Sequence, residues 1–153
     1  MISLFARTVV IAVVSWGITS SASAGTLSDA RLVDVAHSYM TFMSDVGKGV
    51  PESEFSQKVP QLFADSCRKV VNGSVWFESS EGMVPQLRDT KEKAGQWKIT
   101  ISEVIPSAAE SASVVRFVWN SPKLGTYTTL VILHVDDEGR ITEVNEVYNK
   151  YDG

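Results

Sequence analysis

The sequence that decides the fold is a pair of strand-like runs near the C-terminus, GTYTTLVILHV at residues 125–135 and ITEVNEVY at 141–148, joined by DDEGR at 136–140. Two runs rich in β-branched and aromatic residues, around a short acidic turn that closes with Gly139, are typical of a β-hairpin. The first run is apolar on both alternating faces from residue 130 to 133, so we expect a central strand covered on two sides. Alternation in the second run puts Ile141, Glu143, Asn145 and Val147 on one face and Val144, Glu146 and Tyr148 on the other.

The start of the chain is interpreted as a signal peptide over residues 1–24. Arg7 precedes an apolar run at residues 8–18, and Ala22-Ser23-Ala24 has the small-x-small form of a signal-peptidase site. The apolar run is short for a membrane span, so no stable membrane insertion is expected after cleavage. The mature domain would be residues 25–153, exported to the periplasm or secreted.

Composition limits the function classes. The formal net charge is −4, and losing Arg7 with the leader would make it −5. An acidic protein of this kind is a poor candidate for binding nucleic acid or anionic lipid. Cys67 is the only cysteine, so no intrachain disulfide can form, and the residue is expected to be a small buried apolar group. The length suits one domain with a single core.

The rest of the chain predicts three helices and a curled sheet. Residues at three-and-four spacing predict a helix that ends at Gly47, Pro51 starts a shorter one that Pro60 interrupts, and residues 81–94 form the third. Strands are expected at 67–71, 74–78, 97–105 and 113–120, in addition to the C-terminal pair. This order predicts an α+β fold in which three helices pack on the concave face of a curved antiparallel sheet of about four long strands plus a short hairpin.

This order of elements resembles the nuclear transport factor 2-like superfamily, which includes SnoaL-like cyclases and ketosteroid isomerases. The resemblance is carried by Leu62-Phe63-Ala64-Asp65, by the helix that ends before Trp97, and by residues 137–143. It implies a cystatin-like or NTF2-like cone with a pocket between the helices and the sheet.

The isomerase machinery, in contrast, is incomplete in this sequence. Tyr39 matches the tyrosine that donates to the oxyanion in those enzymes. Val71, followed by Asn72, and Val131 stand where the resemblance implies the two catalytic aspartates. Because valine neither accepts nor donates a proton, that mechanism is not available here.

Several side chains are candidates for the pocket. Glu146 is either an acid or base inside a cavity or a solvated carboxylate, and Tyr39 is either a core residue or a hydrogen-bond donor to a ligand. The predicted ligand-binding set is Tyr39, Trp76, Trp119, Val131, Leu133, Val144, Glu146 and Tyr148. We expect Trp97 in the core, His37 to be exposed and His134 on the outer face of the sheet. No metal site and no cofactor are predicted, because neither histidine has a partner at ligand spacing.

Three functions remain open from the sequence. The first is an exported domain that binds a small, mostly apolar molecule and forms a homodimer through the outer sheet face. The second is a lyase, isomerase or cyclase that uses Glu146 and Tyr39 as an acid–base pair. The third is a protein-interaction subunit of an envelope or secretion assembly.

Overall fold

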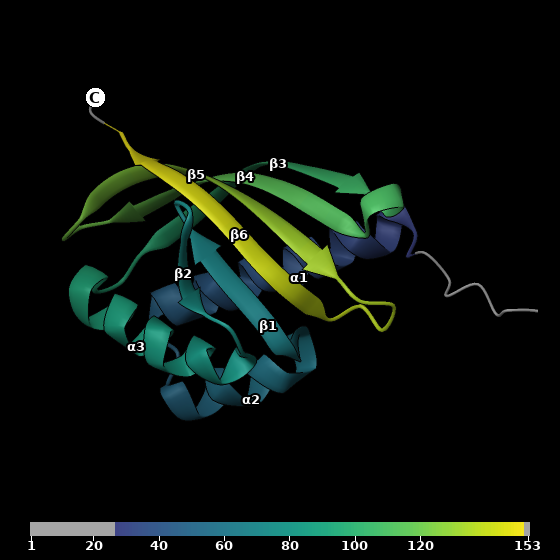
Figure 1. Ribbon diagram of the computed structural model, residues 1–153. Coiled ribbons are helices and arrows are strands. Elements are labelled where there is room, and N and C mark those ends of the chain that lie inside the picture. Colours follow the sequence, from purple (N-terminus) through teal and green to yellow (C-terminus); the bar gives the residue numbers. More distant parts are fainter. Residues whose placement is uncertain (1–26, 152–153) are drawn as a thin grey trace, which may run out of the picture.

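The structure is a computed structural model that describes residues 27–151, so the predicted signal peptide lies outside the described residues. Its helices and strands follow the chain in the order α1 (Asp29–Lys48), α2 (Glu52–Leu62), β1 (Phe63–Val71), β2 (Ser74–Phe77), α3 (Met83–Ala94), β3 (Lys98–Ser107), β4 (Ala112–Ser121), β5 (Gly125–Val135) and β6 (Ile141–Lys150). In Figure 1, α2 and α3 lie below the sheet and α1 passes behind it.

The sheet has the strand order β2-β1-β6-β5-β4-β3. Four of its pairings are antiparallel, but β1 and β6 run parallel, starting from the pair Phe63 and Ile141. The α+β sheet is therefore confirmed with one difference from the antiparallel expectation. A parallel neighbour requires a long crossover rather than a hairpin, and here the whole chain between β1 and β6 supplies it.

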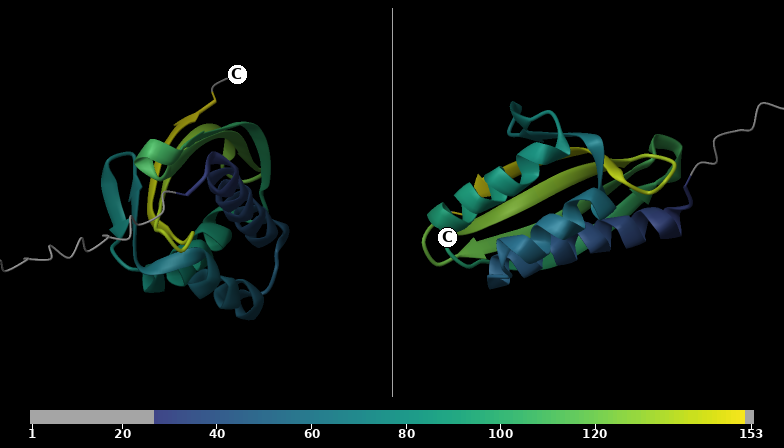
Figure 2. Two further views of the ribbon diagram at one scale, coloured as in Figure 1. Left: turned by 90° about the vertical axis from the view of Figure 1, so that its right-hand side faces the viewer. Right: turned by 90° about the horizontal axis from the view of Figure 1, so that it is seen from below.

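The sheet curves without closing, and the helices cover its concave side. The end-on view on the left of Figure 2 shows the strands curling around α1, with the other helices at the open side of the sheet. Two buried serines of β4 join the layers. Ser113 Oγ donates to the carbonyl of Leu32 in α1 at 3.0 Å, and Ser121 Oγ donates to the carbonyl of Ala94 in α3 at 2.7 Å.

Two local expectations were wrong. Pro60 does not interrupt the second helix, because α2 continues to Leu62. Pro60 lies on the exposed side of α2, where a carbonyl that loses its helical partner can bond to water. The first strand also starts earlier than expected, at Phe63 rather than at Cys67.

A bulge corrects the face assignment of β6. His134 pairs with Glu143 but Val135 pairs with Ile141, so the register shifts within the β5–β6 ladder. The extra residue puts Ile141 and Val144, which are an odd number of positions apart, both on the buried side. Val144, Glu146 and Tyr148 keep their common face.

The outer face of β5 is not covered, contrary to expectation. Leu130 is 41% exposed, whereas its neighbours Val131 and Thr129 are buried. The three helices all lie on the concave side (Figure 1), so the apolar residues of the other face meet solvent in the single chain.

The core fills one half of the cone. Tyr39, Phe42 and Phe63 pack edge to face, with centroids 6.1 Å apart for Tyr39–Phe63 and 5.6 Å for Phe42–Phe63. Strand residues with no exposed surface complete this half, namely Val131, Leu133, Ile141 and Val144. Large side chains therefore occupy the interior near α1, and the space that remains lies toward α3.

Candidate functional site

A pocket of about 340 Å³ lies between α3 and the concave face of the sheet. Most of its lining is apolar or aromatic, including Trp76, Ile99, Phe117, Trp119, Tyr127 and Tyr148. A concave site that combines apolar and aromatic walls with placed polar groups is the usual form of a small-molecule site.

An aromatic row runs from the core at Trp97 across the floor of this pocket, which Trp119, Tyr127 and Tyr148 line. Neighbouring ring centroids are 5.9 Å apart for Trp97–Trp119, 5.4 Å for Trp119–Tyr127 and 5.5 Å for Tyr127–Tyr148. Pairs at this spacing attract each other beyond the area that they bury. The row therefore forms a continuous apolar surface over β4, β5 and β6.

Trp97 anchors this row to α1. Its Nε1 donates to the carbonyl of Met43 at 3.1 Å, and its backbone N–H donates to the carbonyl of Gly47 at 3.1 Å. A Cβ at position 47 would lie 2.5 Å from the indole ring, so the close approach requires glycine. Trp97 is 2% exposed, which confirms its predicted place in the core.

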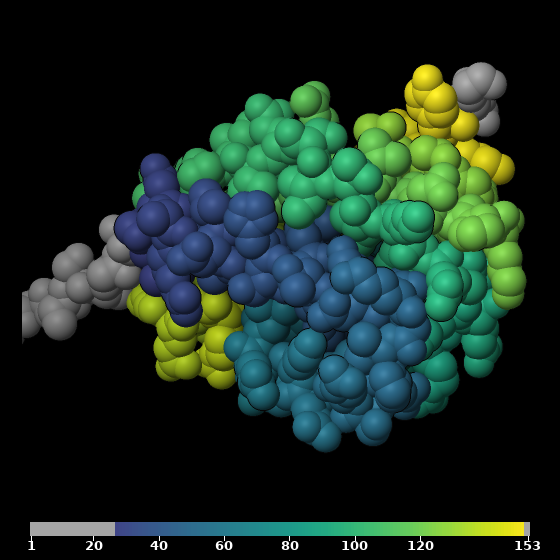
Figure 3. Space-filling model, turned by 180° about the vertical axis from the view of Figure 1, so that it is seen from behind, coloured from purple at the N-terminus to yellow at the C-terminus, as the bar shows by residue number. Residues whose placement is uncertain are grey.

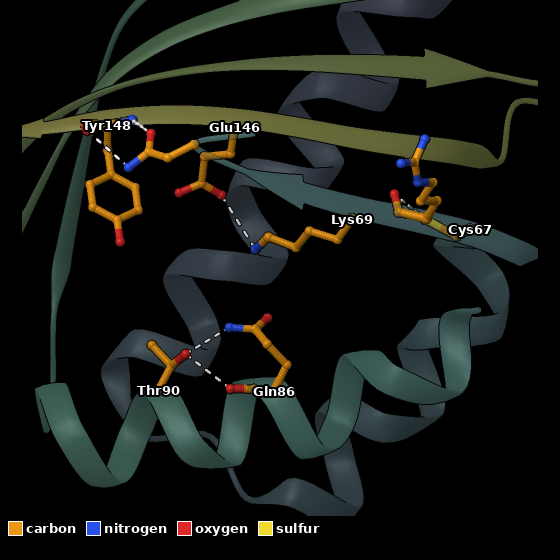
Figure 4. Close-up of polar contacts among 8 residues, drawn as sticks. Cys67, Lys69, Gln86, Thr90, Glu146 and Tyr148 are labelled. Carbon is orange, nitrogen blue, oxygen red and sulfur yellow. Dashed lines mark hydrogen bonds and ion pairs between the residues drawn. The ribbon is translucent and has the colours of Figure 1, made fainter. Parts of the chain in front are cut away.

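One ion pair lies within the apolar lining. Lys69 Nζ on β1 is 3.3 Å from Glu146 Oε2 on β6 (Figure 4), and the lysine side chain is only 3% exposed. The ring of Trp76 covers the ammonium, with its centroid 5.4 Å from Nζ. An ion in such a place loses much of its hydration, so a partner charge is needed to hold it there.

Lys69 is not among the pocket residues predicted from the sequence. It occupies an inward position of β1 between the buried residues Cys67 and Val71. A lysine at an inward-facing position of an otherwise apolar strand face was the available signal, because such a residue is almost never buried without a partner. The partner, Glu146, lies on a strand far away in sequence.

The wall opposite the sheet is formed by the polar face of α3. Gln86 Nε2 donates to Thr90 Oγ1 at 2.7 Å, and Lys93 pairs with Asp89 at 2.7 Å. All four residues line the pocket. The pocket thus has hydrogen-bonding groups on the helix side, and aromatic rings with one ion pair on the sheet side.

The predicted site residues lie in two places. Trp76, Trp119, Glu146 and Tyr148 line the pocket. Val131, Leu133 and Val144 are fully buried in the filled half of the cone, and Tyr39 is 1% exposed there.

Tyr39 nevertheless lies within the electrostatic reach of the pocket. Burial raises the pKa of its hydroxyl well above the usual range, and the negative charge of Glu146 raises it further, followed by Cys67. The hydroxyl therefore stays protonated at neutral pH, so it can donate a hydrogen bond but cannot act as a phenolate base.

The remaining sequence predictions about single residues agree with the structure. His37 is exposed, and alternation along β5 puts His134 on the face opposite to the buried Leu133 and Val135. Cys67 is buried, and desolvation raises the pKa of its thiol to about 12 although the charge of Lys69 acts in the other direction.

A second, wider hollow of about 660 Å³ lies on the outside of the molecule. It is bounded by α1, α2 and the turn between β5 and β6, which meet on the face shown in Figure 3. Its lining mixes both signs of charge, with Arg31, Asp34, Asp45 and Lys58. Phe42 contributes to its lining, but the groove has no row of neighbouring aromatic rings like that of the interior pocket, which is the better candidate site.

No protein-family model matches the sequence, and no curated protein sequence does. Solved structures do match the fold. A candidate isomerase of the SnoaL-like family from Agrobacterium tumefaciens aligns with a TM-score of 0.64 and 14% identity, over 78% of this chain and 98% of that one. A protein with a cystatin-like fold from Methylobium petroleophilum gives 0.64 and 15%, over 84% and 82%. A candidate SnoaL-like polyketide cyclase from Jannaschia gives 0.63 and 13%, over 79% and 87%.

The protein therefore has the NTF2-like, SnoaL-like cone fold that its sequence resembles. At these identities the similarity establishes the fold alone, because one fold hosts many chemistries. Within residues 27–151, no helix is long and apolar enough to cross a membrane.

Proposed function

We propose that the protein binds a small, mostly apolar molecule in the pocket between α3 and the sheet. The observation that carries this proposal is the aromatic row of Trp119, Tyr127 and Tyr148 beside a half of the cone that core side chains leave unfilled. Planar rings offer apolar contact area at a low cost in side-chain entropy. The pocket volume is at the lower end of the usual range for small-molecule sites, so the ligand is compact.

A matched pair of tyrosine variants on one edge of the fold tests this proposal. Tyr148→Ala removes a pocket wall, whereas Tyr151→Ala removes an aromatic that is 67% exposed. Binding of naphthalene derivatives is followed by the indole N–H resonances in NMR spectra. We expect Tyr148→Ala to weaken binding about tenfold, equivalent to about 1.4 kcal/mol, and Tyr151→Ala to have no effect. Equal affinities of both variants and the parent protein would show that ligands bind elsewhere.

The second candidate function is an enzyme of the lyase, isomerase or cyclase type. The placement of Glu146 in the pocket beside Lys69 favours it, because a carboxylate within an apolar site can take up a proton from a bound molecule. Tyr39 would act as a donor from the filled half. The structural relatives described as an isomerase and a cyclase are compatible with this alternative. If the Glu146→Gln variant turned over an identified substrate at an unchanged rate, this enzymatic function of Glu146 would be excluded.

We further propose that two copies associate through the outer sheet face after export. Ile105 and Val147 are each 51% exposed and Leu130 is 41% exposed on this side. An exposed apolar patch of this kind is typical of an interaction surface. A subunit of an envelope or secretion assembly would use the same patch to bind a different protein. Dimerisation of the pure protein distinguishes self-association from that alternative.

A further inference from the structure

We infer that the bound molecule is electrically neutral and that its polar end both donates and accepts hydrogen bonds, between Gln86 on α3 and the Lys69–Glu146 pair on the sheet. This inference rests on the proposed function of the pocket as a small-molecule site. It specifies which polar groups the ligand carries, whereas the aromatic row specifies only that the ligand has an apolar part.

The orientation of the Gln86 side chain follows from its partner. Thr90 Oγ1 donates its only hydrogen to the backbone carbonyl of Gln86 at 2.9 Å. The threonine oxygen can therefore only accept from the glutamine side chain, so the group 2.7 Å away must be the nitrogen Nε2. The carbonyl oxygen Oε1 is consequently the other end of the amide.

That oxygen lacks a donor among the described residues. Gln86 Oε1 is buried and accepts no hydrogen bond. A buried acceptor in this state is costly. In Figure 4 the Gln86 amide rises from α3 toward Lys69, which extends from β1 on the other side of the pocket. A ligand that donates a hydrogen bond would satisfy this acceptor.

The sheet side of the pocket supplies the complementary group. An ammonium has three N–H donors, and Lys69 meets one oxygen of Glu146 at 3.3 Å. Two donors therefore remain for other partners, and Lys69 lines the pocket beside aromatic side chains of the sheet. An acceptor on the ligand is therefore favoured next to Lys69, opposite the donor that Gln86 requires.

The charges of the lining indicate that the ligand is neutral. Four charged side chains line the pocket, and they form two internal pairs, Lys69 with Glu146 and Lys93 with Asp89. The Lys93–Asp89 pair lies at the exposed rim, whereas the Lys69–Glu146 pair is largely buried. Because Lys69 already has its counter-charge, a carboxylate or ammonium added beside it would enter a low-dielectric part of the pocket without compensation. A carboxamide or a hydroxyl beside a carbonyl fits these requirements.

Four probes with one ring system separate the possibilities: naphthamide, methoxynaphthalene, naphthoate and naphthalene, the first three substituted at the same ring position. Naphthamide is neutral and has both a donor and an acceptor, methoxynaphthalene only accepts, and naphthoate is an anion. We expect the parent protein to bind naphthamide about tenfold more tightly than the other three. In Gln86→Met this advantage should disappear while the affinity for methoxynaphthalene stays the same.

Gln61→Met is the matched control, because Gln61 is an exposed helical glutamine outside this pocket, and it should retain the full preference. Equal binding of naphthamide and methoxynaphthalene by the parent protein would overturn the inference and leave the proposed function standing. If naphthoate bound most tightly of the four probes, the inference that the ligand is neutral would be wrong. Binding of none of the probes by folded protein would remove the proposed function and this inference together.

Discussion

The side chain of Asn72 is hydrogen-bonded to both backbone groups of Tyr148. Asn72 Oδ1 accepts from the Tyr148 N–H at 3.0 Å, and Nδ2 donates to the Tyr148 carbonyl at 3.4 Å. The Asn72 backbone N–H also donates to the carbonyl of Glu146 at 2.8 Å. The turn of the β1–β2 hairpin thus extends the parallel β1–β6 ladder and positions the two pocket residues of β6.

Removing this side chain should loosen the pocket wall. Asn72 has a φ of 47°, which glycine also adopts, so Asn72→Gly deletes the two hydrogen bonds without backbone strain. We expect a loss of about 1–2 kcal/mol in the free energy of unfolding, measured in urea. Asn72→Asp keeps the oxygen acceptor and should lose less. An unchanged urea midpoint for Asn72→Gly would mean that the contact contributes nothing.

The ion pair in the pocket predicts strong coupling between its members. Glu146→Gln leaves the buried ammonium of Lys69 without a counter-charge, so we expect the free energy of unfolding to fall by about 2–3 kcal/mol. The double variant Lys69→Met with Glu146→Gln should recover a large part of that loss, because neither charge is then buried alone. Additive effects in this double-mutant cycle would show that the two groups act independently.

The thiol and the phenol in the filled half predict a loss of stability at alkaline pH. The pKa of Cys67 rises from its ordinary value of 9.0 to about 12 on folding, and that of Tyr39 rises as well, both through desolvation. Above pH 9 the unfolded chain therefore binds fewer protons than the folded one. Stability is fully present below that pH and falls as the pH rises, by up to about 1.4 kcal/mol per pH unit for each group.

Two variants check the sign of this pH dependence. Urea unfolding between about pH 8 and pH 10.5 should show a steeper decline for the parent protein than for Cys67→Ala, and Tyr39→Phe should flatten the upper part of the curve. The native thiol should also resist alkylation until the protein unfolds, because only the thiolate is reactive. A flat profile in the parent protein would contradict the burial of both groups.

The uncovered outer face of the sheet predicts a dimer that a charged substitution on this face would dissociate. Leu130 and Val147 are direct cross-strand partners on this face. Placing a lysine at either position should shift the protein toward a monomer in analytical ultracentrifugation, because an unpaired charge would be buried in the interface. Thr41→Lys, at an exposed position of α1, is the control that should leave the mass unchanged. A parent protein that stays monomeric at high concentration would refute the dimer.

The N-terminal segment predicts a processed, exported protein. Expression in a bacterial host with a general secretion system should yield a mature chain that starts at Gly25, measured as intact mass in the periplasmic or culture fraction. Ala24→Asp removes the small residue before the cleavage point and should block processing. Full-length protein in the cytosolic fraction would contradict export.

Much of the fold could be read from the sequence because its determinants are local. The turn at Asn72-Gly73, the hairpin around Gly139 and the three-and-four spacing of α1 each depend on residues a few positions apart. Alternation was less informative where the ladder is irregular. The bulge at the start of β6 shows as a register shift in the pairing of β5 with β6, and Ile141 alone carries no sign of it.

By itself the sequence determined the α+β class, the cone and the inward face that Val144, Glu146 and Tyr148 share, because periodicity and turn residues act over short distances. Only the tertiary structure decided which inward residues became core and which remained at the pocket. Lys69 and Glu146 lie on strands joined by a long crossover, and Gln86 comes from the helix on the other side of the same pocket. Their meeting depends on how the layers pack, and packing is a property of the whole chain.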